Sequence, residues 1–367
     1  MKYHGIVMIL SLLFAVNIAY GQVITTKAKD KLPDESKSKR NTMPKPPNGY
    51  NKPMVAPKGY KLVEYLSDEF NGGKLDETKW MPRSNDGWRG RGARFMEENV
   101  IVANGCLQLK SSVIGSDADL KSLYKDLEDI YVKDESLHIG NNIDVETWSP
   151  AIYGKKWIED WSSGAKYKDV MRKGLNTIGA AIVCSKRPGT KGYYEARMKL
   201  SKIAMSSSWW LQGFHTIEFD ITESYGSYSV DKDNAKIVDA PYKIHTSVWV
   251  NSREFKGKGG IKPKNAKWKT RLCDDFFVLG YEWEDDKLSV YLNDEFQYRF
   301  SFKDIRTGKG DLPIPIETYA SPQYIKFDTE ILLGPLMGWP TKRELRDPDR
   351  NTFYVDWIRV WKPIEQQ

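Results

Sequence analysis

Three carboxylates, Glu218, Asp220 and Glu223, lie within six residues of one segment, and apolar residues are interleaved with them. On a regular strand Glu218 and Asp220 would share one face, and Glu223 would point to the other. A single β-bulge near Ile221 and Thr222 would return Glu223 to the face of the other two, so the spacing predicts a bulged strand. Acids crowded on one face raise one another's pKa, which costs free energy but is useful for chemistry.

Two carboxyl groups about 5 Å apart cleave glycosidic bonds with retention, one as nucleophile and the other as general acid and then base. Glu218 suits the nucleophile and Glu223 the acid/base, while Asp220 between them could orient both by a hydrogen bond. The same triplet could instead form an exposed acidic strand edge or supply oxygen ligands to calcium. The triplet alone leaves these interpretations open.

The segments that must position these acids have the pattern of an all-β protein. Asn104-Gly105 predicts a tight turn between two short apolar runs. Alternating apolar and polar residues predict further strands over 192–200, 276–283, 288–292, 296–300 and 353–361. Many short strands predict two packed sheets, a β-sandwich or jelly roll.

Two long segments, 111–175 and 227–267, interrupt this rhythm and predict binding loops on the sandwich. Within the first, residues 118–131 predict a short helix.

The N-terminus predicts export from the cytoplasm. Lys2 precedes an apolar stretch over 6–19, and Ala19-Tyr20-Gly21 offers the small residues of a cleavage site, so residues 1–21 are interpreted as a signal peptide. The stretch is short for a membrane span, and no later segment is apolar enough for one. We therefore expect a secreted protein, extracellular or periplasmic. The Lys-, Pro- and Ser-rich residues 22–57 predict a flexible linker, and 58–363 the folded domain.

Composition narrows the classes of partner. The net charge of +7 is spread along the chain, which indicates either a solvated surface or attraction to a polyanion. No nucleic-acid-binding motif is present, so nucleic acid is not expected as a partner. The 13 tryptophans suit either a β-rich core or platforms for flat ligands such as sugar rings. Three cysteines, without any CxxC spacing, predict neither a zinc site nor a fully paired disulfide framework.

The ExDxxE triplet, the segment Gly192-Tyr193-Tyr194-Glu195-Ala196-Arg197 and the final strand 354–360 together resemble glycoside hydrolase family 16. Ser67-Asp68-Glu69-Phe70-Asn71 followed by Trp80 is similar to the opening strand of that family. The resemblance covers most of 60–362. It implies a β-sandwich jelly roll of the concanavalin A-like lectin/glucanase type, with a long groove in which β-1,3 or β-1,4 bonds of glucans or galactans are cleaved.

Two further segments narrow the resemblance. The stretch 88–95, followed by Glu98-Asn99-Val100, is similar to β-porphyranases and some β-agarases, and so is Phe327-Asp328-Thr329-Glu330 with 338–341. The implied function is a secreted, endo-acting, retaining hydrolase of β-1,4 bonds in agar-type red-algal galactans, either porphyran or agarose. Its partner would be that polysaccharide, and we expect a monomer.

The resemblance also assigns roles in binding. Trp88 and Trp209 would stack on sugars at the cleavage site, Arg91 would bind the ligand, and Glu330 would hydrogen-bond a sugar hydroxyl. Gln212 stands where porphyranases often place a second sulfate-binding Arg, which leaves neutral agarose open as the substrate. His215 and His245 would face the groove or serve as structural histidines.

Several alternatives remain at this stage. A carrageenase or laminarinase would share the fold, a catalytically inactive sandwich would only bind polysaccharide, and a metal-stabilised adhesion domain would use the acids differently. No metal is expected in the active site and no cofactor is required, although the resemblance allows a structural calcium far from the groove.

Overall fold

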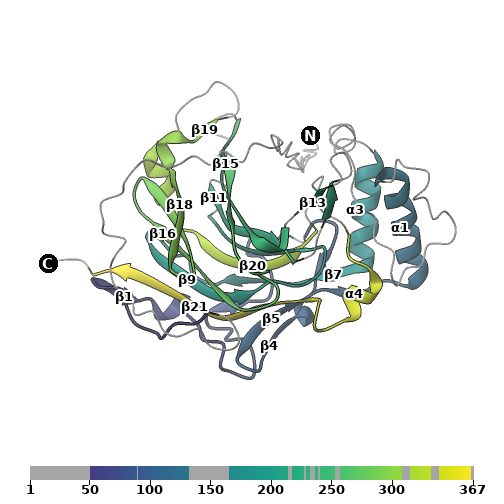
Figure 1. Cartoon of the computed structure of the whole chain (residues 1–367), viewed down its shortest axis with the longest axis horizontal. Coiled ribbons are helices and arrows are strands. Elements are labelled where there is room, and N and C mark those ends of the chain that lie inside the picture. The colour runs from purple at the N-terminus through teal and green to yellow at the C-terminus, as the bar shows by residue number, and fades with distance from the viewer. Residues whose placement is uncertain are drawn as a thin grey trace, which may run out of the picture.

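Two curved β-sheets, one lying inside the curve of the other, form the body of the protein in the computed structural model (Figure 1). The structure describes residues 50–88, 90–131, 165–213, 217–226, 229–231, 236–238, 240–252, 257–307, 315–331 and 339–364. Within these ranges each sheet has eight strands, and every pairing in the two sheets is antiparallel. The predicted all-β, two-sheet sandwich is confirmed.

The outer sheet has the strand order β18-β17-β16-β9-β21-β5-β4, with β1 also paired to β21. Its strands are β1 (Tyr60–Leu62), β4 (Val100–Ala103), β5 (Cys106–Lys110), β9 (Gly192–Lys199), β16 (Phe277–Trp283), β17 (Lys287–Leu292), β18 (Glu295–Ser301) and β21 (Thr352–Pro363). These strands match the alternating runs of the sequence. Asn104 and Gly105 have φ of 55° and 72°, which confirms the tight turn predicted between β4 and β5.

The inner sheet has the strand order β19-β15-β14-β11-β10-β20-β8-β2. Its strands are β2 (Trp80–Met81), β8 (Ile182–Ser185), β10 (Ser206–Gln212), β11 (Ile217–Tyr225), β14 (Lys243–Ser252), β15 (Gly257–Lys267), β19 (Arg306–Thr307) and β20 (Tyr324–Glu330). The acidic segment lies on β11, in the middle of this sheet. The expectation that 227–267 is a loop was wrong, because β14 and β15 form a long hairpin within it; Ile244, Val248 and Val250 turn into the core.

Smaller elements complete the described chain. A three-stranded sheet joins β3 (Arg94–Phe95), β6 (Ser112–Val113) and β7 (Ile178–Ala180), and a two-stranded one joins β12 (Ser229–Asp231) and β13 (Lys236–Val238). Short 3₁₀ helices are η2 (Glu64–Leu66), η3 (Glu97–Asn99), η6 (Ala240–Tyr242), η7 (Phe302–Asp304) and η8 (Ile316–Ala320).

Three α-helices stand together beside one end of the sandwich (Figure 1): α1 (Asp117–Tyr131), α3 (Ala165–Thr177) and α4 (Lys342–Arg346). The helix predicted over 118–131 is confirmed as α1. Leu123 and Tyr124 of α1 and Met171 of α3 join a second apolar cluster, separate from the core between the sheets. The described part of the first long segment therefore contributes two helices, α1 and α3, which we call the helical annex.

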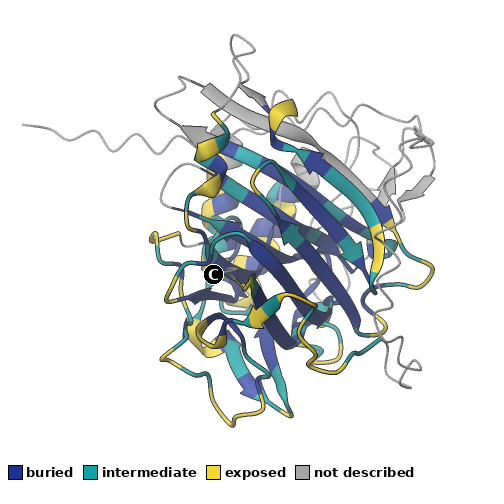
Figure 2. Ribbon diagram, turned by 90° about the vertical axis from the view of Figure 1, so that its left-hand side faces the viewer, coloured by how far each residue is buried: buried dark blue, intermediate teal, exposed yellow. Residues whose placement is uncertain are grey.

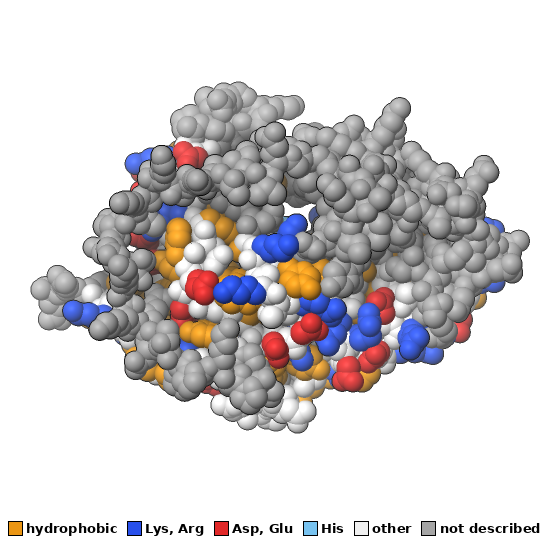
Figure 3. Space-filling model, viewed as in Figure 1, with side chains coloured by type: hydrophobic (Ala, Val, Ile, Leu, Met, Phe, Trp, Pro, Cys, Tyr) orange, Lys and Arg blue, Asp and Glu red, His pale blue; other side chains and the backbone are white. Residues whose placement is uncertain are grey.

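The main core lies between the two sheets, and exposure is concentrated at the loops and strand ends (Figure 2). Successive side chains of a strand point to opposite faces of its sheet. Leu279 and Tyr281 of β16 therefore turn inward, into the same core as Trp209 and Phe219 of the inner sheet. On the face shown in Figure 3, basic and acidic side chains are interspersed, as expected for charge that is spread along the chain.

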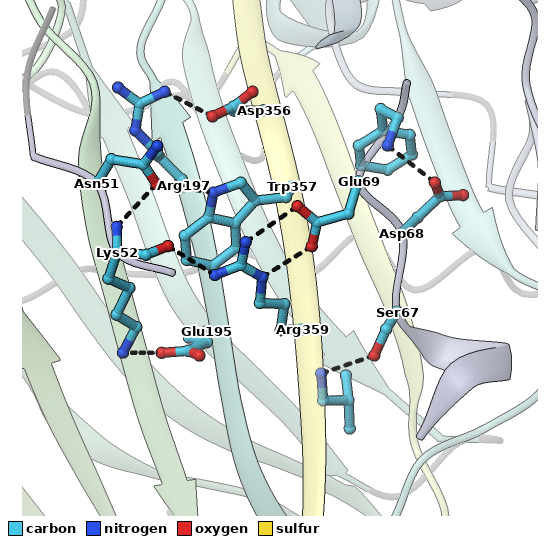
Figure 4. A network of polar contacts seen from close by, with 12 residues as sticks. Asn51, Lys52, Ser67, Asp68, Glu69, Glu195, Arg197, Asp356, Trp357 and Arg359 are labelled. Carbon is cyan, nitrogen blue, oxygen red and sulfur yellow. Dashed lines mark hydrogen bonds and ion pairs between the residues drawn. The ribbon is translucent and has the colours of Figure 1, made fainter. Parts of the chain in front are cut away.

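The folded part begins before the boundary expected at residue 58. Tyr50 donates its backbone N–H to Phe276, and Asn51 accepts from the Trp357 indole. The Lys52 ammonium pairs with the buried Glu195 carboxylate (Figure 4). The last residues of the expected 22–57 linker are therefore fixed to the outer sheet, since these polar contacts offset the entropy of ordering them.

The expected signal peptide and the rest of the linker lie outside the described residues, and so do Trp148, Trp157 and Trp161 of the first long segment. None of the described helices is both long enough and apolar enough to cross a bilayer.

Candidate active site

A β-bulge in β11 aligns the three acids. Opposite β10, Trp209 pairs with Thr222 and the next residue, Trp210, pairs with Asp220, so Ile221 has no partner on β10. The extra residue shifts the alternation by one position. The bulge predicted near Ile221 is thus confirmed, and Glu223 returns to the face of Glu218 and Asp220.

The register of β10, β11 and β20 identifies the other residues of that face. Ser208 lies between Glu223 and Asp328, and Gln212 lies between Glu218 and Tyr324. We call the side of these three strands that is turned away from the core the acidic face. It consists of Ser206, Ser208, Trp210, Gln212, Glu218, Asp220, Glu223, Tyr225, Tyr324, Lys326, Asp328 and Glu330.

Burial and mutual repulsion raise the pKa of the three acids on β11. The pKa of Glu218 rises to about 8 through burial and the charge of Asp220. The pKa of Glu223 also rises to about 8, through burial and the charges of Glu330 and Glu218. The pKa of Asp220 lies well above its ordinary value because of burial and the charge of Glu223. The site therefore retains protons near neutral pH, as a general acid requires.

Asp220 is held by hydrogen bonds from the neighbouring strand β14. The Ser247 hydroxyl donates to Asp220 at 2.5 Å, and the Trp249 indole donates to the Ser247 oxygen at 2.8 Å. Asp220 is almost fully buried, so this chain fixes its orientation between the two glutamates.

Gln212 lies between a buried lysine and Glu218. Its amide Nε2 donates to Glu218 Oε2 at 2.9 Å, while its Oε1 accepts from Lys326 Nζ at 2.8 Å. Lys326 also donates to Ser84 and pairs with Asp86, and its Nζ lies 4.3 Å from the Trp210 ring centroid. Gln212 is thus already engaged in the protein.

Trp88 and Arg91 reach the same face from a loop that precedes β3. The Arg91 charge lowers the pKa of Glu218, Glu223 and Glu330, so its guanidinium lies within electrostatic range of all three. The guanidinium is 5.8 Å from the Trp88 ring, which is 38% exposed. Burial raises the pKa of Glu330, although Arg91 and a hydrogen bond from the Trp88 side chain oppose that rise.

Several buried oxygens of the acidic face have no hydrogen-bond partner within the described part of the chain: Tyr225 Oη, Asp328 Oδ1 and Glu330 Oε2. Buried polar atoms are ordinarily hydrogen-bonded. Burial is the largest cause of the raised pKa of Tyr225, and the charge of Glu223 is the next. These oxygens therefore lie beside Glu223, where they are available to a hydroxyl-rich ligand.

The structure corrects one expected site residue and adds others. Trp209 is fully buried and stacks on Phe327 in the core, because Trp210, not Trp209, shares the face of Gln212. His215 lies outside the described residues. His245 contacts the Tyr225 ring edge-on, with centroids 6.5 Å apart.

Lys326, Asp328 and Trp210 were not anticipated from the sequence as parts of the site. Alternation offered a signal for two of them: counting back by two from Glu330 gives Asp328 and Lys326 on the same strand face. Among the described residues, no group of three or more His, Cys, Asp or Glu side chains is arranged to hold a metal ion. The structural calcium remains a prediction.

Comparison with known proteins supports this description of the fold and identifies related sequences. The family model for the GH16 domain of β-porphyranases A–D matches residues 141–363. β-Porphyranase E of Zobellia galactanivorans is 27% identical over 327 residues, covering 84% of this chain and 92% of the relative. β-Agarase AgaA of Microbulbifer thermotolerans is 30% identical over 212 residues, covering 53% and 45%. The crystal structure of porphyranase B from Zobellia galactanivorans superposes with a TM-score of 0.56 at 22% identity, covering 87% of this chain and all of that one. The predicted jelly-roll architecture is confirmed by that superposition.

Proposed function

The chain belongs to glycoside hydrolase family 16, in the group described as the GH16 domain of β-porphyranases A–D, and we propose that it is a secreted, endo-acting, retaining hydrolase of β-1,4 bonds in agar-type galactans. The observation that carries the chemistry is the bulge at Ile221, because it brings Glu218, Asp220 and Glu223 to one face. Export is proposed from the signal-peptide pattern of residues 1–21.

The surroundings of the two glutamates differ in the way that their roles require. Glu218 receives the Gln212 amide and the charge of Lys326, both of which favour its ionised form. The pKa of both glutamates rises to about 8, but the charges that raise it for Glu223 come from three carboxylates, Glu330, Glu218 and Asp328, and favour its protonated form. This contrast supports Glu218 as the nucleophile and Glu223 as the acid.

The reaction follows in two balanced steps. The Glu218 carboxylate attacks the anomeric carbon as Glu223 gives its proton to the departing glycosidic oxygen, which leaves a glycosyl ester on Glu218. Glu223 then takes a proton from water as that water attacks the same carbon and releases Glu218. Two displacements retain the configuration, and Asp220, oriented by Ser247, lies between the two reacting groups.

The substrate class is inferred from the acidic face and the relatives. Trp88 offers a partly exposed ring, and Arg91 a forked donor. Tyr225, Asp328 and Glu330 offer to sugar hydroxyls oxygens that have no hydrogen-bond partner in the part of the chain that the structure describes. The named relatives are porphyranases and an agarase. Because Gln212 is held by Lys326 and Glu218, we propose that no sulfate is bound at that position.

The proposal is tested by incubating the purified chain with agarose, porphyran, κ-carrageenan and laminarin and measuring released reducing ends. We expect release from agarose or porphyran, with new reducing ends initially in the β configuration by NMR. Glu218→Gln and Glu223→Gln should each lower kcat by about 10³-fold or more, while Glu97→Gln, at an exposed surface glutamate, should retain activity. An active Glu218→Gln enzyme would refute the assigned nucleophile, and α-configured products would refute retention. Release only from carrageenan or laminarin would refute the substrate class.

A further inference from the structure

Lys326 is a fully buried lysine at the centre of the acidic face. Its ammonium donates to Gln212 Oε1 at 2.8 Å and to Ser84 Oγ at 3.1 Å, and it lies 3.2 Å from Asp86 Oδ2. Burying a charged lysine is costly unless its donors are satisfied. Here the three contacts come from two segments, strand β10 and the loop of Ser84 and Asp86, and both segments are held to β20 by this one cation.

The chemistry of these groups fixes the orientation of the Gln212 amide. An ammonium can only donate hydrogen bonds, so the oxygen of the Gln212 amide must face Lys326. The amide N–H₂ is then left pointing at Glu218, where Nε2 lies 2.9 Å from Oε2. An amide polarised by a cation on its oxygen side is a stronger donor on its nitrogen side.

We propose that Lys326 and Gln212 form a relay that positions Glu218 and favours its ionised form. The relay rests on the proposed function, since it gives the nucleophile of that reaction its orientation and charge. Neither residue touches the reacting atoms, so both are positioning residues. Gln212 thereby acquires a role different from the recognition of substrate.

The other charges that face Glu218 make such a relay necessary. Asp220 and Glu330 both raise the pKa of Glu218, as burial does, while Lys326 and Arg91 lower it. The largest influences on the pKa of Glu223 are burial and the charges of Glu330, Glu218 and Asp328, with Arg91 as the cationic neighbour. Lys326 therefore acts on Glu218 both by its charge and through the hydrogen bonds of Gln212.

The relay differs in its consequences from a lysine that merely anchors the loop of Ser84 and Asp86. An anchoring lysine would act on Glu218 only through its charge, so replacing Gln212 would leave the ionisation of Glu218 unchanged. A relay predicts that the acidic limb of the kcat/KM profile, which reports ionisation of the nucleophile, moves to higher pH when either residue is replaced.

The first test measures kcat/KM against pH for Lys326→Met and Gln212→Met. We expect each to lose roughly 10- to 100-fold in kcat/KM, the usual effect of losing a hydrogen bond to a charged group. The acidic limb should move upward by about one pH unit in Lys326→Met and by less in Gln212→Met, which keeps the cation. Lys52→Met is the matched control, because it removes a paired lysine that lies against the outer sheet, and its limb should stay in place.

The second test needs no substrate. Carboxyl NMR of glutamate-labelled protein follows the ionisation of Glu218, assigned by the signal lost in Glu218→Gln, and its midpoint should rise in both relay variants but not in Lys52→Met. Unchanged midpoints in both variants would overturn the relay even if agarose is cleaved. If Lys326→Met does not fold, Gln212→Met decides alone. If raised midpoints accompany a wild-type chain that cleaves no galactan, the relay stands and the proposed function fails.

Discussion

At the scale of single residues, Trp209 and Trp210 are chain neighbours with opposite surroundings. Trp209 is fully buried between the sheets, stacked on Phe327 and edge-on to Tyr281. Trp210 lies on the acidic face, where its Nε1 donates to Asp328 at 2.9 Å and its ring lies under the Lys326 ammonium. Trp209 therefore packs in the core between the sheets, whereas Trp210 contacts two ionisable groups of the site.

This difference predicts that leucine lowers mainly the stability at position 209 and mainly the activity at position 210. Trp209→Leu should lower the free energy of unfolding by about 2–4 kcal/mol through lost packing, with an unchanged KM where the protein is still folded. Trp210→Leu should cost less stability but lower kcat/KM by roughly tenfold or more, because Lys326 loses its ring contact and Asp328 its donor. Urea denaturation and initial rates measure both effects. A raised KM in Trp209→Leu alone would restore the role in sugar binding first expected for it.

The same pair shows what the sequence could and could not predict. Positions 209 and 212 are three apart, so on a regular strand they cannot share a face, and Trp209 and Gln212 could not both belong with Glu218. Glu218, Asp220 and Glu223 could be grouped because their spacing is local. Lys326 could not be placed beside Gln212, since the register between strands more than a hundred residues apart is set by packing that no local pattern records.

At the scale of elements, the helical annex is packed against the loop that carries Trp88 and Arg91. Gly92, with φ of +67°, lies against Met171 of α3, Ile331 and Trp339. A Cβ on Gly174 of α3 would lie 2.2 Å from the Gly92 carbonyl oxygen, so helix and loop touch backbone to backbone. The annex was expected to be mainly binding loop; its helices instead support a segment next to the site.

This contact predicts that Gly174→Ala acts against its usual direction. Alanine in a helix interior ordinarily stabilises by about 1 kcal/mol relative to glycine, but here the added methyl must push the Gly92 carbonyl away. We expect the melting temperature to fall and KM to rise, because Arg91 precedes Gly92 and moves with it. Gly73→Ala, where an added Cβ meets nothing within 4 Å, is the control and should change neither value. A higher melting temperature with unchanged KM in Gly174→Ala would show that the annex does not position the loop.

At the scale of the whole molecule, a chain of net charge +7 gathers carboxylates on one face of its inner sheet. Glu218, Glu223, Asp220, Asp328 and Glu330 all have raised pKa values, with burial as the largest cause in each. The free-energy cost of burying these carboxyls together must be offset by contacts elsewhere in the fold. The ordered contacts of the outer sheet contribute to that, including the paired hydrogen bonds of Arg359 to Glu69 at 2.8 and 2.9 Å.

The raised pKa values make global stability depend on pH with a definite sign. A carboxyl that has a pKa of about 8 when folded and an ordinary value near 4.5 when unfolded binds more protons in the folded state between these limits. Its favourable contribution is therefore complete below about pH 4.5 and is lost as the pH rises through about 8. Glu223→Gln removes that loss, so we expect it to be more stable than wild type at pH 9 by roughly 1–3 kcal/mol and nearly equal at pH 5. Comparing urea denaturation of the two proteins cancels the titrating groups that do not interact with Glu223, and Glu97→Gln should show no such pH-dependent difference. A Glu223→Gln protein whose stability differs from wild type by the same amount at both pH values would mean that Glu223 is not held protonated by its surroundings.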